Sequence, residues 1–218
     1  MSIAENLAQV KQQIREAALA AGRDPESVRL IAVSKTKPVS DLREALAAGQ
    51  RELGENYAQE LRDKAEQMAG EPVEWHFIGG LQRNKVKYVV NKAALIHAVD
   101  SLRLGQEISK RASGRQPILV SVNLGDEQSK SGVPASEALA LCTQLMELPG
   151  VELRGLMCIP PPGQGQWFQQ LAELAAAGRA QGLPLTELSM GMSADYREAI
   201  AHGATYVRVG SAIFGSRG

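Results

Sequence analysis

The regular alternation of apolar runs with amphipathic segments constrains the fold of this chain most strongly. The apolar runs are short and rich in β-branched residues, which predicts strands. The segments between them carry apolar residues at helical spacing, which predicts helices. Strands that alternate with helices pair in parallel, and eight such units predict a closed (β/α)8 TIM barrel of the α/β class. The expected strands are residues 28–34, 52–56, 73–78, 94–99, 117–123, 151–157, 186–189 and 205–209.

One further helix is expected before the first strand, at residues 2–21, where Ser2 and Glu5 have capping-box spacing. Serines are also expected to cap two later helices, at Ser40 and Ser101. The alternative fold is a doubly wound open sheet, which usually has a glycine-rich turn after its first strand. Here that position holds Ser-Lys-Thr, and no linker or repeat interrupts the chain, so we expect one barrel domain over residues 1–218. The other expected helices are residues 41–48, 59–68, 84–91, 101–111, 136–148, 167–180 and 195–202.

Composition excludes several function classes. The chain has 24 Lys+Arg and 24 Asp+Glu, so its formal net charge is zero, which argues against nucleic acid or acidic lipid as a partner. Charged residues interrupt the first twenty positions, and no apolar run approaches the ~18 residues of a membrane span. The two cysteines, Cys142 and Cys158, fit a reducing compartment. We therefore expect a cytoplasmic protein.

Two lysines follow the first expected strand. Lys35 and Lys37 are two positions apart, and in an extended chain both side chains would emerge on one side. They could form an ordinary solvent-exposed junction, because lysine is mostly exposed. Alternatively, Lys35 could be a Schiff-base nucleophile whose pKa is lowered by burial and by the charge of Lys37. We expect Lys35 to be the more buried of the two, because it lies closer to the apolar run.

Two serine- and glycine-containing turns follow the last two expected strands. They are SMGMS at 189–193 and Gly210-Ser211. In (β/α)8 barrels the active site lies at the carboxyl ends of the strands, and phosphate often binds after strands seven and eight. Serine hydroxyls and backbone N–H groups can form an anion site there. Either turn alone could be an ordinary helix cap, but together they favour phosphate.

Arg208 interrupts the apolar strand at 205–209 and faces opposite to its neighbouring valines. If the valines face the helices, Arg208 points into the barrel mouth. Pyridoxal 5′-phosphate (PLP) sites commonly place an aspartate or an arginine against the pyridine nitrogen. The lysine amine, the phosphate turns and the inward arginine together indicate PLP.

Other candidate residues carry weaker signals. His76 lies between two aromatic residues, and neither His97 nor His202 has metal-ligand spacing with it, so no metal site is expected. Lys130 lies in a long loop after the fifth strand and could make a second, weaker phosphate contact.

Motifs along nearly the whole chain resemble those of the PLP homeostasis protein family. The segment 160–166 is shorter than is typical of that family. The motifs are VSKTKP at 33–38, GENY at 54–57, WHFIG at 75–79, LQRNK at 81–85, SKSG at 129–132, GLM at 155–157, SMGMS at 189–193 and VRVGSAIFG at 207–215.

This resemblance implies a fold-type III, alanine racemase-like barrel that holds PLP as a Schiff base on Lys35, without established catalytic turnover. It implies that Arg208 faces the pyridine nitrogen and that Asn56 and His76 line the cofactor. The residues implied at the phosphate are Met192, Ser193, Gly210 and Ser211.

The expected function is participation in intracellular PLP (vitamin B6) homeostasis, with PLP-dependent apo-enzymes as candidate recipients. A PLP-dependent amino-acid racemase is the alternative, and a phosphosugar aldolase that uses Lys35 directly is a third option. Related racemases take a second proton donor from a separate β domain, which is not expected here because the chain ends nine residues after the last strand. No apolar seam is evident, so a monomer is expected.

Overall fold

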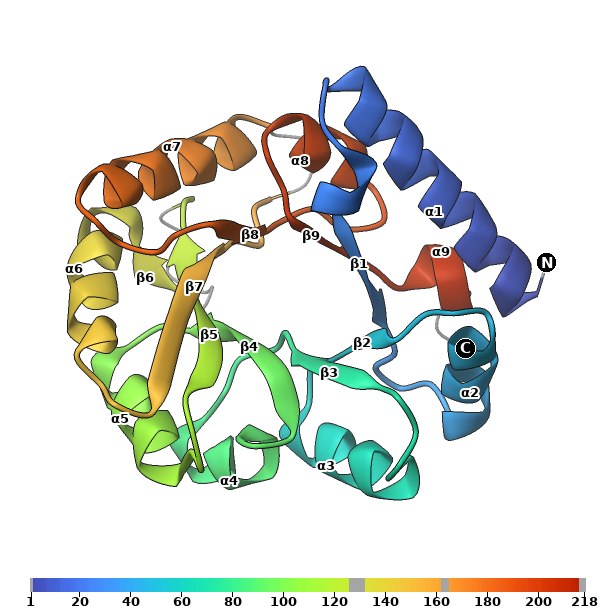
Figure 1. The fold of residues 1–218 in the computed structure, drawn as a ribbon, viewed down its shortest axis with the longest axis horizontal. Coiled ribbons are helices and arrows are strands. Elements are labelled where there is room, and N and C mark those ends of the chain that lie inside the picture. The colour runs from blue at the N-terminus through green and yellow to red at the C-terminus, as the bar shows by residue number, and fades with distance from the viewer. Residues whose placement is uncertain (1, 126–131, 162–164, 216–218) are drawn as a thin grey trace.

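The strands close into a barrel in the computed structural model, which describes residues 2–125, 132–161 and 165–215 (Figure 1). All pairings are parallel, and the additional pairing of β4 with β5 closes the ring. The strands of the ring, in chain order, are β1 (Arg29–Val33), β2 (Glu52–Glu55), β3 (Glu74–Phe77), β4 (Ala93–Val99), β5 (Gln116–Asn123), β7 (Val151–Met157), β8 (Glu187–Ser189) and β9 (Tyr206–Val209). This confirms the predicted (β/α)8 barrel and excludes the open sheet.

Helices surround the ring on its outer side (Figure 1). They are α1 (Ile3–Ala20), α2 (Val39–Ala47), α3 (Ala58–Gln67), α4 (Val86–Val89), α5 (Leu102–Arg111), α6 (Ala135–Met146), α7 (Gln166–Ala180), α8 (Tyr196–Ala201) and α9 (Ser211–Phe214). Two 3-10 turns, Pro25–Ser27 and Arg83–Lys85, precede β1 and α4. The short strand β6 (Val133–Pro134) pairs with β5 outside the ring.

The predicted helix 84–91 is in fact a 3-10 turn followed by the single α-helical turn of α4. The prediction that Ser40 caps its helix is wrong. The helix α2 begins at Val39 because Pro38 has extended backbone angles and takes the N-cap position, so Ser40 lies inside the first turn. The capping box of Ser2 with Glu5 and the Ser101 cap are both confirmed.

Two apolar layers hold the barrel together. The larger lies between the strands and the helices, and α1 packs its buried face against α2, α8 and α9. Burial of this apolar surface is the main term that favours folding. The smaller layer fills the barrel interior and consists of Ile31, Leu95, Ala98, Leu119, Met157 and Tyr206.

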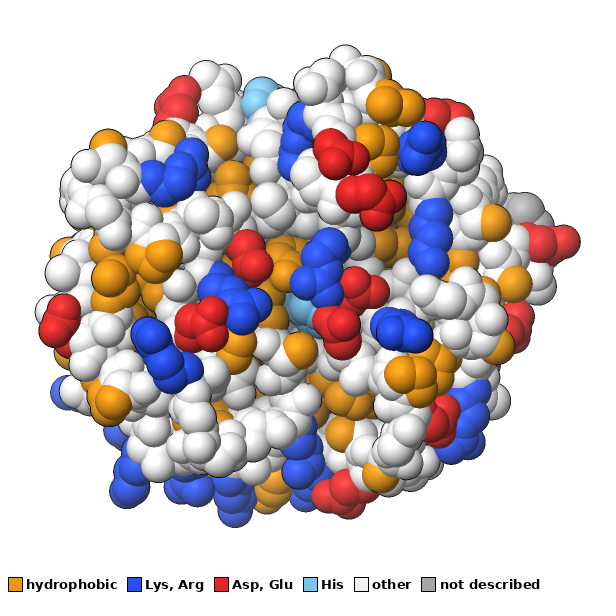
Figure 2. Space-filling view, in the orientation of Figure 1, with side chains coloured by type: hydrophobic (Ala, Val, Ile, Leu, Met, Phe, Trp, Pro, Cys, Tyr) orange, Lys and Arg blue, Asp and Glu red, His pale blue; other side chains and the backbone are white. Residues whose placement is uncertain are grey.

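Ion pairs lie at the amino ends of the strands. Arg29, the first residue of β1, contacts Glu52 at 3.1 Å and Glu74 at 2.7 Å, and its Nη1 donates to the Tyr206 hydroxyl at 3.0 Å. Figure 2 shows acidic and basic side chains gathered around a central hollow of the viewed face. In barrels of this kind the active site lies at the other face, where the carboxyl ends of the strands meet. None of the helices in the described ranges is long and apolar enough to cross a membrane.

Candidate functional site

A tight turn, and not an extended strand, presents the two lysines after β1. The strand ends at Val33, Thr36 has a φ of 64°, and the Lys37 N–H donates to the Ser34 carbonyl at 3.0 Å. The prediction that both amines emerge on one side of an extended chain is therefore wrong. Lys35 and Lys37 are both half-buried, and which of the two is the more buried stays a prediction.

A buried polar network lies beneath this turn. The Lys64 ammonium donates to the Ser34 carbonyl at 2.7 Å, to Glu55 at 2.8 Å and to Glu60 at 2.7 Å. The Ser34 hydroxyl donates to Glu55 at 2.6 Å. Burial raises the pKa of Glu55 above its ordinary value, and the nearby Lys64 charge opposes that rise. This network could not be predicted from the sequence, because Lys64 occupies an ordinary position of an amphipathic helix.

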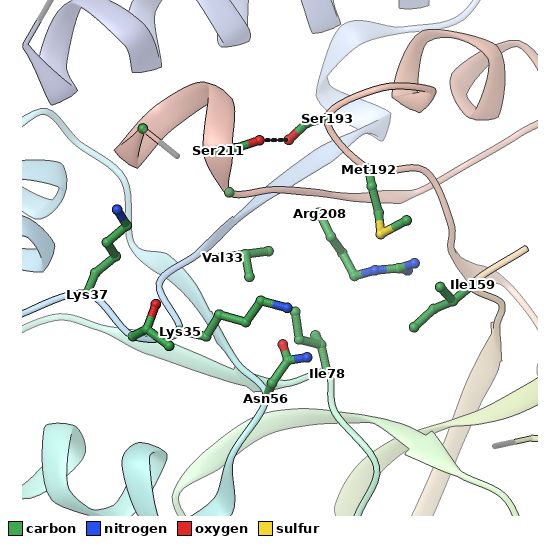
Figure 3. A pocket seen from close by; sticks show the side chains of 13 residues that line it. Val33, Lys35, Lys37, Asn56, Ile78, Ile159, Met192, Ser193, Arg208 and Ser211 are labelled. Atoms are coloured by element: carbon green, nitrogen blue, oxygen red, sulfur yellow. Dashed lines mark hydrogen bonds between the residues drawn. The ribbon is translucent and has the colours of Figure 1, made fainter. Parts of the chain in front are cut away.

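The turn forms one wall of a cavity of about 330 Å³ at the carboxyl ends of the strands (Figure 3). Its volume is within the usual range for small-ligand sites. Seven of the eight predicted cofactor residues line it, and His76 does not. The lining residues are Val33, Lys35, Thr36, Lys37, Asn56, Ile78, Ile159, Met192, Ser193, Arg208, Gly210, Ser211 and Gly215.

Lys35 extends across the cavity toward Asn56, whereas Lys37 extends in a different direction (Figure 3). Asn56 directly follows β2, and its Oδ1 atom is buried without a hydrogen-bond partner. The chain that leaves β3 passes very close to the backbone of Asn56. Only glycine fits at Gly79, because a Cβ there would lie 2.1 Å from the Asn56 carbonyl oxygen. The cavity wall therefore contains a buried acceptor that a bound molecule could satisfy.

The two predicted phosphate turns meet at one side of the cavity. The Ser211 hydroxyl donates to the Ser193 hydroxyl at 3.3 Å (Figure 3). The first turn requires glycine, because Gly191 has a φ of 91° and a Cβ there would lie 2.6 Å from the Ala199 Cβ. The Met192 N–H donates to the Asp195 carboxylate at 2.6 Å, which fixes the turn before α8. Two hydroxyls thus converge where an anion could bind.

Arg208 lies inside the barrel, as predicted, while Val207 and Val209 pack in the outer apolar layer. Its guanidinium donates to the Ser189 hydroxyl at 2.6 Å and to the Cys158 carbonyl at 2.9 Å. Burial lowers the pKa of Arg208, but arginine stays protonated at neutral pH. These two hydrogen-bond acceptors are both neutral, so the cation is available to a polar group in the cavity.

His76 points into the barrel interior rather than to the cavity. Its Nδ1 lies 3.0 Å from His97 Nε2, and His97 Nδ1 lies 2.8 Å from the Ser189 hydroxyl. Burial lowers the pKa of His76 to about 3 and holds the pKa of His97 well below its ordinary value, so both rings are neutral. His76 therefore reaches the cavity only through His97, Ser189 and Arg208, because its strand directs it toward the barrel axis.

One donor in this chain of hydrogen bonds is fixed. Arg208 can only donate, so the Ser189 hydroxyl accepts from it. His76 Nε2, at the far end of the chain, is a buried atom without a hydrogen-bond partner among the described residues. Sequence reasoning missed Ser189 as a partner of Arg208 and His97 as a partner of Ser189, because Ser189 and His97 are 19 and 111 residues away from Arg208.

The remaining predictions concern Lys130, the segment 160–166, metal binding and the two cysteines. Lys130 and residues 162–164 of the short 160–166 segment lie outside the described residues. Across the described ranges, no group of three or more His, Cys, Asp or Glu side chains could hold a metal ion. Both cysteines are free and buried.

Comparison with known proteins places this geometry in a family. The family model for the alanine racemase N-terminal domain matches residues 5–218. The pyridoxal phosphate homeostasis protein of Pseudomonas aeruginosa is 47% identical over 224 residues, which cover 99% of this chain and 96% of the relative. The structure of PipY from Synechococcus elongatus with PLP bound superimposes with a TM-score of 0.86 at 39% identity, and covers 98% of this chain and 100% of PipY.

More distant structures share the fold alone. Alanine racemase from Clostridium difficile has a TM-score of 0.77 at 14% identity, and the match covers 98% of this chain but 57% of the racemase. The barrel is thus common to both groups, whereas the sequence identity is high for the homeostasis protein and PipY and low for the racemase. The chain belongs to the alanine racemase N-terminal domain family and, within it, to the family of pyridoxal phosphate homeostasis proteins.

Proposed function

We propose that this protein binds PLP reversibly through a Schiff base on Lys35 and takes part in intracellular PLP homeostasis, with residues 1–218 acting as one cofactor-binding unit. The observation that carries the proposal is the convergence of the Lys35 amine, the Arg208 guanidinium and the hydroxyls of Ser193 and Ser211 on one cavity. PLP carries an aldehyde, a ring nitrogen and a phosphate, which match these three kinds of group. The names of the relatives support the same function.

Unsatisfied polar groups of the cavity fit this cofactor. The buried Asn56 Oδ1 lacks a donor, which the hydroxyl of the pyridine ring would supply. Arg208 would donate to the ring nitrogen. Ser193 and Ser211, with the adjacent backbone of Met192 and Gly210, would hold the phosphate. His76 would act at a distance, through its hydrogen-bonded neighbours.

We propose that the protein does not turn over amino acids. PLP supplies an electron sink when its ring nitrogen is protonated, and a fixed cation such as Arg208 disfavours that protonation. Racemisation also needs a proton donor on each face of the substrate. Among the described residues that line the cavity, the titratable side chains are Lys35, Lys37 and Arg208, and the two lysines come from the same turn.

PLP-dependent apo-enzymes in the cytoplasm are the proposed recipients. The cavity is reached from solvent, because Ile159 and Met192 on its wall are 45% and 37% exposed. The proposed state is a monomer, since the sequence shows no apolar seam along which a second copy would pack.

Titration with PLP tests the site through Arg208. We expect one binding site, and we expect Arg208→Ala to lower the affinity by about tenfold, because a buried hydrogen bond to the ring nitrogen is lost. Absorbance or fluorescence titration measures the dissociation constant, and circular dichroism checks the fold. Arg103→Ala, which removes an exposed arginine of α5, is the matched control. Unchanged affinity in Arg208→Ala would mean that the guanidinium does not face the cofactor.

Exchange of the α-proton tests the absence of turnover. The PLP-loaded protein is incubated in deuterated water with a panel of L- and D-amino acids, beside Lys35→Ala. We expect slow exchange, because a positioned acid or base typically contributes about 10²–10⁴-fold and a second one is missing among the described cavity residues. Exchange at about 1 s⁻¹ or faster would support the racemase alternative instead.

A further inference from the structure

The turn that presents Lys35 has an unfavourable backbone conformation. Thr36 has a φ of 64°, a region that β-branched residues rarely adopt. Such a conformation persists only where the surrounding structure holds it. The turn must therefore be held by contacts from outside itself.

Those contacts come from one face of α3. The Glu60 carboxylate accepts from the Thr36 N–H at 2.6 Å, at the strained residue. The Lys64 ammonium donates to the Ser34 carbonyl at 2.7 Å, on the other side of Lys35. The two side chains also pair with each other at 2.7 Å, since they are one helical turn apart. Glu60 and Lys64 thus fix the backbone on both sides of Lys35.

The same two residues are kept out of the cavity. Neither Glu60 nor Lys64 lines it, so they would act on a bound molecule only through the turn. The Lys64 side chain is only 6% exposed and is paired with the fully buried Glu55 carboxylate. Burial and this ion pair hold the Lys64 side chain in place. We name Glu55, Glu60 and Lys64 the turn anchor.

We propose that Glu60 and Lys64 of the turn anchor are positioning residues that select Lys35, and not Lys37, as the amine that attacks the PLP aldehyde. This inference rests on the proposed function. In the attack, the Lys35 nitrogen forms a C=N bond with the aldehyde carbon. The aldehyde oxygen leaves as water with the two protons of the neutral amine.

Selection between the two lysines is needed because both of them line the cavity. Lys35 and Lys37 both line it and are both half-buried, so both amines are near a molecule bound there. Their side chains nevertheless take different directions, and Lys35 is the one that extends toward Asn56 (Figure 3). The backbone angle at Thr36, the residue between them, sets this difference. Relaxation of Thr36 would reorient the two amines relative to the cavity.

Variants of Glu60 test the proposal, because this side chain is partly exposed and its loss leaves the buried pair of Glu55 with Lys64 intact. Glu60→Ala removes the acceptor of the Thr36 N–H, whereas Glu60→Gln keeps an oxygen acceptor there. Glu66→Ala changes an exposed acidic residue of the same helix and is the matched control. Circular dichroism and thermal unfolding confirm that each variant is folded.

Two measurements are made on each variant. In the first, PLP is added and the linkage is trapped with borohydride at timed intervals, and peptide mapping gives the rate and the share of label on each lysine. In the second, the ligand-free chain is labelled with trace acetic anhydride, and the Lys35-to-Lys37 labelling ratio is determined against the exposed Lys87.

We expect Glu60→Ala to slow trapping at Lys35 by about tenfold, to move label to Lys37 and to bring the acetylation ratio closer to one. Glu60→Gln should restore most of the rate and the partition, and Glu66→Ala should match the unsubstituted protein. A Glu60→Ala protein with unchanged rate, partition and ratio would overturn the inference. Failure of the unsubstituted protein to trap PLP at Lys35 would overturn the proposed function, and the acetylation ratio would still decide the role of Glu60.

Discussion

Replacement of Lys35 by alanine is expected to abolish covalent binding of PLP. Lys35 extends across the cavity between Asn56 and Arg208, and no other residue labelled in Figure 3 places an amine there. The phosphate turns and Arg208 remain in the variant, so PLP should still bind without a covalent bond and be removed by gel filtration. The Schiff-base absorbance band and the mass after borohydride reduction measure the loss.

Lys37→Ala is the matched control for this experiment. It removes the second amine of the same turn, which also lines the cavity, and it should keep both the absorbance band and the covalent mass. Label found mainly on Lys37 in the unsubstituted protein would show that the attachment site is misassigned. A covalent mass that persists in Lys35→Ala would have the same meaning.

The largest expected effect on stability is that of Lys64→Met. Methionine is close in length to lysine but leaves the buried Glu55 carboxylate without its cation and the Ser34 carbonyl without its side-chain donor. Removal of one partner of a buried ion pair typically costs about 3–5 kcal/mol of unfolding free energy. Urea denaturation measures this change, and Lys87→Met, at an exposed position, should stay within about 0.5 kcal/mol of the unsubstituted protein.

A double variant separates the buried charge from the lost packing. Glu55→Gln with Lys64→Met removes both charges, and paired removal of a buried ion pair is often close to neutral. The double variant should therefore be more stable than Lys64→Met alone. Equal stability of the two would show that the uncompensated carboxylate is not the cause.

The destabilisation in Lys64→Met should also depend on pH. Burial already raises the pKa of Glu55 above its ordinary value of 4.5, and Lys64 is the largest influence that lowers it. Without Lys64 the folded-state pKa rises further above the unfolded value. A raised pKa means that stability is retained below about pH 4.5 and lost as pH rises through the folded pKa. The deficit relative to the unsubstituted protein should thus grow from acidic to neutral pH, and a constant deficit would contradict this assignment.

The sequence by itself determined the barrel and the cofactor hypothesis. Strand and helix periodicities are local, because they reflect which side of each element is buried. They predicted the strands of the closed ring to within one residue at each boundary. The carboxyl ends of parallel strands meet on one face, so Lys35, Arg208 and the turns at Ser193 and Ser211 could be expected to lie close together.

Only the tertiary structure decided how those residues are presented. The turn at Lys35 depends on Glu60 and Lys64 of a later helix, and the histidine pair depends on the register of β3 with β4. Neither set has a spacing that links it to the residues it contacts, because the contacts join elements whose distance apart is fixed only when the barrel closes. Local patterns thus specify elements and their order. The hydrogen bonds that orient a functional amine or a buried arginine follow from packing between distant segments.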